Sequence, residues 1–297
     1  MPSMRELRER RATVSSIEQI TKAMKVVSVS KLRRTQRALE NMRPFAEKSR
    51  EVFRLLADDP AAQANPFIAK RDIKKVCYVL FVGNKGLCGA YNNNVLRFLV
   101  NMIAGEKRPC SLVVAGRWGS DMIRELDLPV KHTFTQISDT PDMDQGIEIA
   151  GYLRDMYLSG EADEIVLVYE KYHNVMLQKP EAQNLLPVEL AQKEAQSDRL
   201  QFEFEPERRM VLDNAVELYI VSALYGVLLE AKAGEHASRM TAMTTATDNT
   251  EDLLRELKIY MNRARQAEIT TQISEIVGGA SAMKKYEEKE AKRSSDE

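Results

Sequence analysis

The stretch YVLFVGNKGLCGAYNNNV, residues 78–95, joins an apolar segment, a glycine-rich turn and a helix start, the order found in phosphate-binding sites. In such sites, backbone N–H groups at a helix N-terminus converge on the anion, and glycines let the backbone approach it. Here Gly83, Gly86 and Gly89 give G-x-x-G-x-x-G, whereas dinucleotide sites use G-x-G-x-x-G. Lys85 precedes a glycine and not the Ser or Thr of a triphosphate loop. The spacing therefore favours a tight strand-to-helix turn.

Histidine side chains, the usual acid–base catalysts near neutral pH, do not gather into a motif in this sequence. His132, His173 and His236 are scattered, and no acid or nucleophile motif lies near them. The segment CSLVVAG, which would be the second strand of a dinucleotide fold, is followed by Arg117 and not by an acidic residue for a ribose. A nucleotide-dependent enzyme built on the glycine turn is therefore the weaker interpretation.

The composition is that of a globular chain with balanced charge. Its 297 residues are 44% hydrophobic and 29% charged, with a formal net charge of -1. This balance favours neither a nucleic-acid binder nor a strong membrane-surface binder. No signal peptide opens the sequence, and no apolar run approaches the roughly 20 residues that span a bilayer, so we expect membrane contact only through partners. Three cysteines without a C-x-x-C pair indicate a reducing compartment and no zinc site: Cys77, Cys88 and Cys110.

Two long helices are predicted at the ends of the chain. The first, residues 1–58, carries apolar or small residues at spacings of three and four, with a bend expected at Pro44. The second, residues 207–283, contains no proline. Small and polar residues interrupt both apolar stripes, which predicts an antiparallel coiled coil with uneven packing. The second helix is longer by about 20 residues, so on the order of 30 Å of it would extend unpaired. The charged tail, residues 284–297, is expected to be frayed or disordered.

Residues 72–205 alternate apolar segments with helical ones. We expect strands at KVCYVLFV, CSLVVAG, VKHTFT, EIVLVYEKY and HNVMLQ. Helices are expected at NNNVLRFLVNMI with asparagine caps, near Asp121 and over 144–158, and a polar loop over 180–199. This alternation indicates a small, mostly parallel, Rossmann-like α/β domain. The predicted fold class is therefore mixed, α+β with α/β: a long antiparallel coiled coil of the terminal helices with this domain inserted between them.

Three segments carry specific sequence: IEQITKAMKVVSVSKLRRTQ near the start, GLCGAYN in the middle, and ASRMTAMTTATDNTEDLLRELKIYMNRARQAEITTQISEIVGGASAM near the end. Together they closely resemble the gamma subunit of F-type ATP synthase, in order over nearly the whole chain. The resemblance implies a central rotor shaft that couples rotation of the membrane c-subunit ring to the conformational cycle of the catalytic beta subunits. It implies as partners the alpha and beta subunits, the epsilon subunit and the c ring, and no nucleic acid.

The resemblance also assigns roles to individual residues. It implies a family turn, in which family members bind no nucleotide, at Gly86, Leu87, Cys88, Gly89 and Asn92. It implies contacts with the ring of alpha and beta subunits at Met24, Lys25, Arg239, Arg265, Gln266, Thr270 and Glu275. The basic first helix would attract an acidic segment of the beta subunits, although a basic run is also typical of a solvated helix face. For the arginines, the alternative is ordinary i, i+4 pairing with a neighbour such as Glu235.

In this family ATP chemistry takes place on the beta subunits, so the resemblance implies no catalytic, cofactor or metal site in this chain. No transit peptide and no plastid-type cysteine pair occur, which favours a bacterial complex, peripheral on the cytoplasmic side of the inner membrane. A coiled-coil scaffold or nucleic-acid adaptor is the alternative, given the basic first helix. That basic run lacks the interleaved aromatic residues typical of single-stranded nucleic-acid binders.

Overall fold

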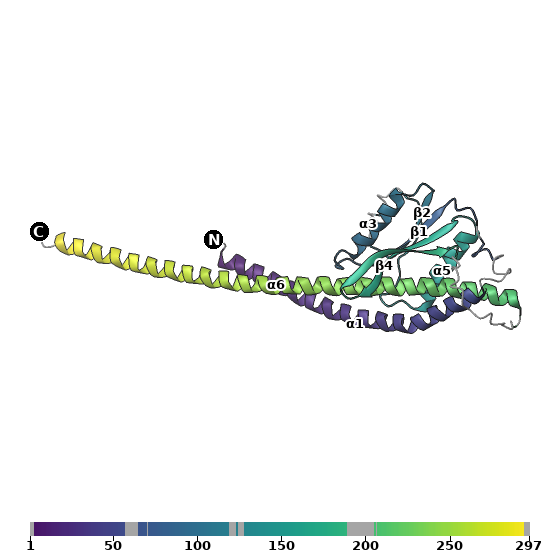
Figure 1. The fold of residues 1–297 in the computed structure, drawn as a ribbon. Coiled ribbons are helices and arrows are strands. Elements are labelled where there is room, and N and C mark those ends of the chain that lie inside the picture. Colours follow the sequence, from purple (N-terminus) through teal and green to yellow (C-terminus); the bar gives the residue numbers. More distant parts are fainter. Residues whose placement is uncertain are drawn as a thin grey trace. The chain divides into compact units, whose positions relative to one another are not determined.

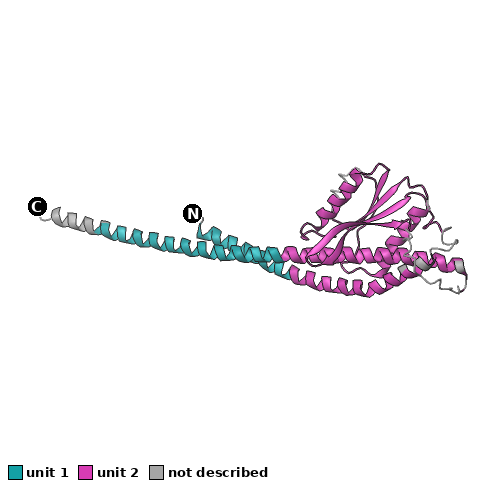
Figure 2. Ribbon diagram, in the orientation of Figure 1, with its two compact units in different colours: residues 1–23, 244–297 teal, residues 24–243 magenta. Residues whose placement is uncertain are grey.

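The computed structural model describes residues 3–56, 65–69, 71–118, 123, 128–188, 205 and 207–293. The chain divides into two compact units, a smaller one of residues 1–23 with 244–297 and a larger one of residues 24–243 (Figure 2). Two helices pass through both units, α1 at Met4–Leu56 and α6 at Arg208–Arg293 (Figure 1). Pro44 lies inside α1, which continues through it.

The larger unit contains a five-stranded sheet in the order β3-β2-β1-β4-β5. Its strands are β1 Val76–Phe81, β2 Cys110–Ala115, β3 Val130–Phe134, β4 Glu164–Asn174 and β5 Leu177–Leu186. The first four strands pair in parallel, whereas β5 runs antiparallel to β4. The predicted fold class, two long terminal helices with a mostly parallel α/β sheet between them, is confirmed.

The hairpin of β4 and β5 differs from the sequence prediction. Residues 180–186 belong to β5, where the polar composition predicts a loop, and HNVMLQ spans the hairpin turn and is not a separate strand. Pro180 is tolerated because β5 is an edge strand, where a missing backbone N–H needs no partner. The rest of the predicted loop, residues 189–199, lies outside the described part of the chain.

Helices cover both faces of the sheet (Figure 1). On one face α3, Tyr91–Ala104, packs against side chains such as Tyr78, and on the other α5, Met143–Leu158, packs with α6 against side chains such as Val79. Successive strand residues point to opposite faces, and because both faces are buried the strands are continuously apolar. Both helices match the prediction, whereas the helix expected near Asp121 falls almost entirely outside the described residues.

The asparagines that begin α3 do not cap it. Ala90 occupies the N-cap position and makes no side-chain hydrogen bond. Asn92 lies inside the helix, buried, and its side-chain oxygen accepts a hydrogen bond from the Gly83 N–H at 2.8 Å. The expected asparagine cap is therefore wrong, because this side chain binds the turn that precedes the helix.

α1 and α6 pair in antiparallel fashion within each unit. Residues further along α1 contact residues nearer the start of α6: Leu7 with Leu257 and Thr21 with Thr247 in the smaller unit, and Leu32 with Ala233 in the larger one. Small and polar residues take part in these contacts, as the interrupted apolar stripes predict.

α6 is longer than the sequence predicts. It has 86 residues against 53 in α1, and it continues through residues 284–293, which were expected to be frayed or disordered. Residues 265–281 are all exposed. In the smaller unit, the described part of α6 beyond Ala264 therefore has no side chain buried against α1.

One apolar stretch within Arg209–Ser281 corrects the expectation that no segment could span a bilayer. By length and composition alone, this stretch is apolar enough to cross a membrane, and 44% of it is buried inside the fold. The same helix contributes apolar residues at helical spacing to the core beneath the sheet, so burial inside the fold accounts for its composition: Leu212, Val216, Ile220, Leu224, Val227 and Ala231.

A buried carboxyl group lies on β4. Glu170 is 2% exposed, and one of its two carboxyl oxygens has no hydrogen-bond partner among the described residues. Burial raises the pKa of Glu170 to about 7, although a hydrogen bond from Asn94 opposes the rise. The folded protein therefore holds a proton at pH values where the unfolded chain has already released it.

We expect this proton to make folding pH-dependent. Between the ordinary pKa of 4.5 and a folded pKa of about 7, the folded state binds more protons than the unfolded one, so stability should fall as pH rises through this window. The decrease is at most about 3 kcal/mol. Urea unfolding of the full chain at pH 5 and pH 8 measures it, and Glu170→Gln should remove this part of the pH dependence. The assignment would be contradicted if the unfolding free energy of Glu170→Gln kept the pH dependence of the wild type. It would also be contradicted if Glu148→Gln, a change at an exposed residue, reduced that pH dependence equally.

Candidate functional site

The glycine turn, residues 83–89, connects β1 to α3 and is the first part of the site. Leu87 and Gly89 adopt left-handed backbone, with φ of 60° and 58°. Asn92 accepts from the N–H of Gly83 and donates to the Cys88 sulfur at 3.1 Å. The N–H of Gly83, which a phosphate loop would present to an anion, is therefore bound to a side chain of α3.

The second part is a buried ion cluster of Lys232, Glu235 and Arg239 on α6. Glu235 is 1% exposed, and its carboxylate accepts from the Lys232 ammonium at 2.8 Å and from the Arg239 guanidinium at 2.7 Å. The spacings of three and four residues place both cations on the same side of the helix as the carboxylate. The buried carboxylate is therefore paired with two cations of its own helix.

Arg239 joins the two parts. Its guanidinium also donates to the backbone carbonyls of Lys85 and Gly86, at 3.2 and 3.4 Å. The Glu235 carboxyl group lies close to Gly83, where an added Cβ would come within 3.0 Å of it. The glycine turn is thus held against α6 by an arginine that a buried carboxylate orients.

The charge state of the cluster follows from its packing. Burial raises the pKa of Glu235, but Lys232 and Arg239 outweigh that effect and hold the pKa below its ordinary value. The carboxylate therefore stays ionised. Removing one partner of a buried pair is costly, because it leaves the other charge without compensation.

His236 ties the same stretch of α6 to a loop after β3. It is fully buried, and its Nε2 donates to the backbone carbonyl of Asp139 at 2.7 Å. Burial lowers the pKa of His236, which favours the neutral ring. The Asp139 carboxylate in turn pairs with Lys31 of α1. Asp139 therefore connects both long helices to the sheet within the larger unit.

The helix residues expected to contact other subunits lie in different environments. Met24 and Lys25 are half-buried in the larger unit. Arg239 is buried in the cluster, where it makes the i, i+4 pair with Glu235 in addition to its hydrogen bonds to the turn. The other four are exposed on α6 in the smaller unit, where Thr270 donates to the backbone of Gln266: Arg265, Gln266, Thr270 and Glu275. The structure therefore brings only Arg239 to the glycine turn.

The residues that complete the site could not be predicted from the sequence. The spacing Lys232, Glu235, Arg239 carries the signal of an ion cluster on one helix face, but exposed helices show the same spacing. His236 and Asp139 carry no local signal of a pairing 97 residues apart. Only burial distinguishes these residues from surface charges.

Comparison with known proteins identifies the family. A family model described as ATP synthase matches residues 3–283. An ATP synthase gamma chain of Pelotomaculum thermopropionicum is 39% identical over 283 residues, covering 95% of this chain and 100% of the relative. The chain belongs to the ATP synthase gamma chain family. A gamma chain of Moorella thermoacetica is 41% identical, covering 96% of this chain and 100% of that one. Residues 284–297 lie beyond the matched family region.

Solved structures agree with this assignment. A central stalk and c-ring structure of the Tetrahymena thermophila mitochondrial ATP synthase matches with a TM-score of 0.61 and 26% identity, covering 76% of this chain and 99% of that one. A Euglena gracilis mitochondrial ATP synthase structure matches in fold with a TM-score of 0.66 at 20% identity, covering 94% of each chain. The chain is a central-stalk subunit of a rotary ATP synthase, which favours the rotor interpretation over a scaffold, an adaptor or a nucleotide-dependent enzyme.

We predict that Arg239→Ala loosens the glycine turn. The substitution removes one of the two cations that meet buried Glu235, and with it the donor to two turn carbonyls, while Lys232 remains, so it should cost about 2–3 kcal/mol of unfolding free energy. Buried Cys88 should then react faster with a thiol reagent, because burial raises its pKa and shields it. Urea unfolding and peptide-resolved thiol labelling of the full chain measure both effects.

Arg255→Ala provides the control for this prediction. Arg255 pairs with Asp252 on the same helix, but both side chains are exposed, so its loss should cost about 1 kcal/mol or less. Equal effects of the two substitutions on stability and on Cys88 labelling would show that the cluster does not hold the turn.

Proposed function

We propose that this chain transmits rotation between a membrane c-subunit ring and the catalytic beta subunits of a proton-translocating ATP synthase. Its partners are then the alpha and beta subunits around the shaft, the epsilon subunit and the c ring. The observation that carries the proposal is the match to gamma chains over nearly the full length, which includes both long helices and the sheet. Neighbouring structures that contain a c ring support it.

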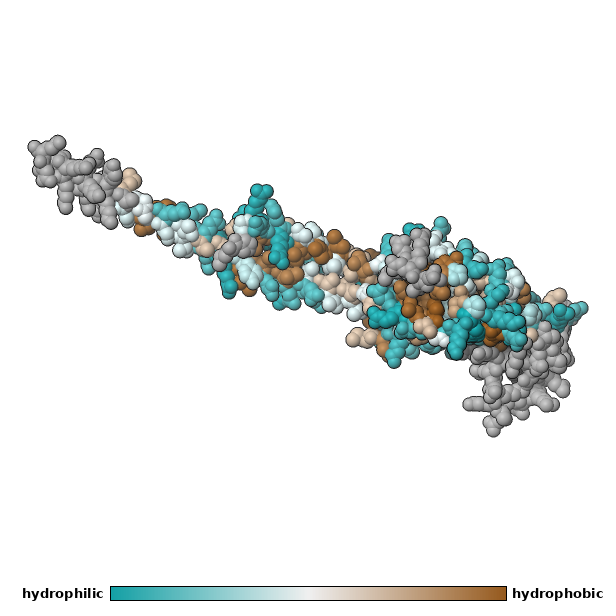
Figure 3. All heavy atoms as spheres, turned by 90° about the horizontal axis from the view of Figure 1, so that it is seen from above, coloured by the Kyte–Doolittle hydropathy of each residue, from teal (hydrophilic) through white to brown (hydrophobic). Residues whose placement is uncertain are grey.

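The exposed part of α6 supports a protein partner for the smaller unit. Ile269, Ile273, Ile276 and Val277 are 47–71% exposed at spacings that place them on one side of the helix. In the space-filling view, apolar residues drawn in brown lie at the surface among hydrophilic ones (Figure 3). An apolar stripe of this kind marks a surface that another protein covers. Surrounding alpha and beta subunits would provide that cover.

The polar neighbours of this stripe would supply directional contacts. Arg265, Gln266, Thr270 and Glu275 are exposed on the same stretch of α6. An arginine fork on a carboxylate is a strong and directional pair, able to favour one angular position of a shaft. On α1, Lys25 would add attraction towards an acidic segment of the beta subunits. In this proposal, coupling therefore depends on side chains whose binding partners lie on other subunits.

Catalysis and location complete the proposal. ATP synthesis and hydrolysis take place on the beta subunits, so this chain contributes no catalytic residue, cofactor or metal site. Its complex lies peripherally on the cytoplasmic side of a bacterial inner membrane. Its similarity to gamma chains of bacteria supports this location.

We expect Gln266→Ala and Arg265→Ala to lower turnover and preserve assembly. Both residues are exposed on a helix, and alanine is the best helix former, so the helix should remain intact while directional bonds are lost. ATP hydrolysis by the purified complex should fall several-fold, with unchanged subunit stoichiometry by native mass spectrometry. Lys258→Ala, an exposed change on the same helix, is the matched control. Full turnover in both test variants would remove these residues from the coupling contacts.

A second experiment concerns the tail beyond the family region. Residues 284–297 carry many charges, which are costly to bury unless paired, so they should emerge into water beyond the tip of the shaft. Deleting 284–297 should leave assembly, hydrolysis and proton coupling close to those of the wild type. Extending the deletion back through Ile273 should reduce coupling, because the exposed apolar stripe is then lost. A several-fold change from the short deletion alone would reveal a regulatory tail.

A further inference from the structure

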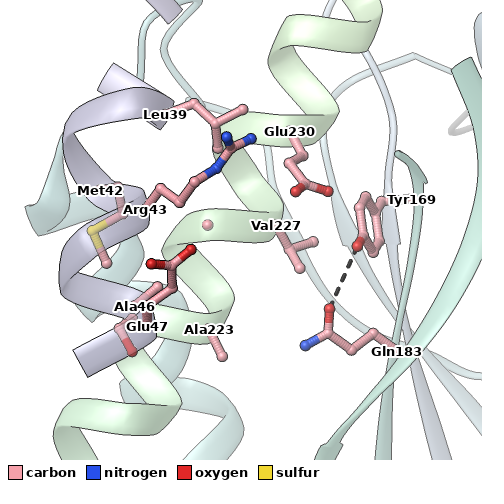
Figure 4. Close-up of a pocket in the computed structure, with 12 residues that line it drawn as sticks. Leu39, Met42, Arg43, Ala46, Glu47, Tyr169, Gln183, Ala223, Val227 and Glu230 are labelled. Carbon is pink, nitrogen blue, oxygen red and sulfur yellow. Dashed lines mark hydrogen bonds between the residues drawn. The ribbon is translucent and has the colours of Figure 1, made fainter. Parts of the chain in front are cut away.

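A cavity of about 200 Å³ lies in the larger unit between α1, α6 and the edge of the sheet (Figure 4). Leu39, Met42 and Arg43 line it from α1, and Val227 and Glu230 from α6. The strands β4 and β5 contribute Tyr169 and Gln183. The cavity thus lies where both long helices meet the sheet.

A glycine keeps this cavity open. Gly226 lies in the interior of α6 and lines the cavity, and a Cβ added there would meet no atom within 4 Å beyond its own helix turn. Glycine destabilises a helix interior relative to alanine, and no close approach of another segment requires it here. A larger side chain at this position would fill the space that the cavity occupies.

The polar groups of the cavity are incompletely paired. One carboxyl oxygen of Glu230 is buried without a hydrogen-bond partner among the described residues. The Tyr169 hydroxyl lies within hydrogen-bond reach of the Gln183 side-chain oxygen, at 3.4 Å, and of the Glu230 carboxyl group, whose other oxygen stays unpaired. Arg43 and Glu47, on successive turns of α1, have no ion-pair partner within the described part of the chain. Figure 4 shows the Glu230 carboxyl group on the same side of α6 as Tyr169.

The charged groups and the apolar side chains that line the cavity indicate the kind of ligand that would fit it. Two carboxyl groups and one guanidinium line the cavity. Arg43 pairs with neither carboxylate among the described residues, so the cavity has one negative charge in excess when all three groups are ionised. Met42, Leu39 and Val227 offer contact area to a flat apolar group. Engineered apolar cavities of about 150 Å³ admit benzene, so an aromatic ring with one attached group fits this volume.

We propose that this cavity binds a small aromatic cation of about ten non-hydrogen atoms, whose N–H groups donate to the free oxygen of Glu230 while its ring packs on Met42 and Val227. The ligand would contact α1 and α6 together and so restrain one helix against the other in the larger unit. This binding site does not depend on the proposed rotor function, because binding is measured on the chain itself.

The pH dependence of binding gives a signature specific to Glu230. Burial raises the pKa of Glu230, with Lys171 opposing the rise. A cation binds the ionised form, so affinity should increase with pH and level off above the pKa of this group. Other charged groups in or beside the cavity are Arg43 and Glu47 on α1, Lys171 and His173 on β4, and Glu181 on β5.

Benzamidine, a ring that carries a planar amidinium, is the probe. Calorimetric titration of the full chain at pH 8 should give saturable one-site binding with a Kd of about 1 mM or tighter. Glu230→Gln should weaken it at least tenfold and remove its pH dependence, whereas Glu256→Gln, an exposed change on the same helix, should leave it unchanged. Benzamide, which has the same shape without the charge, should bind at least tenfold more weakly.

A filling variant separates the cavity from the protein surface. Gly226→Leu should abolish benzamidine binding and leave the chain folded, as circular dichroism would show, because the added side chain enters open space. Hydrogen exchange at residues 39–47 should slow on binding in the wild type and not in Gly226→Leu. The proposal is overturned if benzamidine does not bind, if water alone fills the cavity in the titrated protein, or if either variant binds it as the wild type does.

Discussion

The buried carboxylate of Glu235 is the constraint on which the larger unit depends most. It is 1% exposed, and two cations on its own helix meet it. One of them, Arg239, uses the same Nη2 nitrogen to donate to backbone carbonyls of the glycine turn. A buried ion pair gives little net stability by itself, but it requires a defined geometry. Here that geometry fixes how the turn after β1 lies on α6.

α6 changes character along its length, and its sequence changes with it. In the larger unit, large apolar residues such as Leu224 and Leu228 fill the core beneath the sheet. Small residues follow at Ala233 and Ala237, where α1 packs closely through Leu32. In the smaller unit, residues 265–281 are exposed and include isoleucines that none of the described residues buries. A single helix thus serves as a core element in one part and as a surface for partners in another.

Packing within the larger unit also leaves room unused. Gly226 and the unpaired carboxyl oxygen of Glu230 line the same cavity. A larger side chain at position 226 would fill the space, and an aliphatic side chain at position 230 would leave no oxygen unpaired. Protein interiors are usually close-packed, and buried polar atoms usually find partners. Here an open space and an unpaired carboxyl oxygen occur together between the two long helices.

The sequence by itself determined the two long helices, the first four strands, the turn and the family. These features depend on periodicity over a few residues or on long specific segments such as GLCGAYN, and neither requires knowledge of what lies nearby. The tertiary structure decided the rest of the site. Arg239 reads as a surface contact residue, Asn92 as a cap and Pro180 as part of a loop. Their actual partners are set by segments far away in the chain, 154 residues away for Arg239 and Lys85. Local spacing determines which side of a helix a charge occupies. Burial strengthens the electrostatic interactions of that charge, and burial arises only when distant segments pack together.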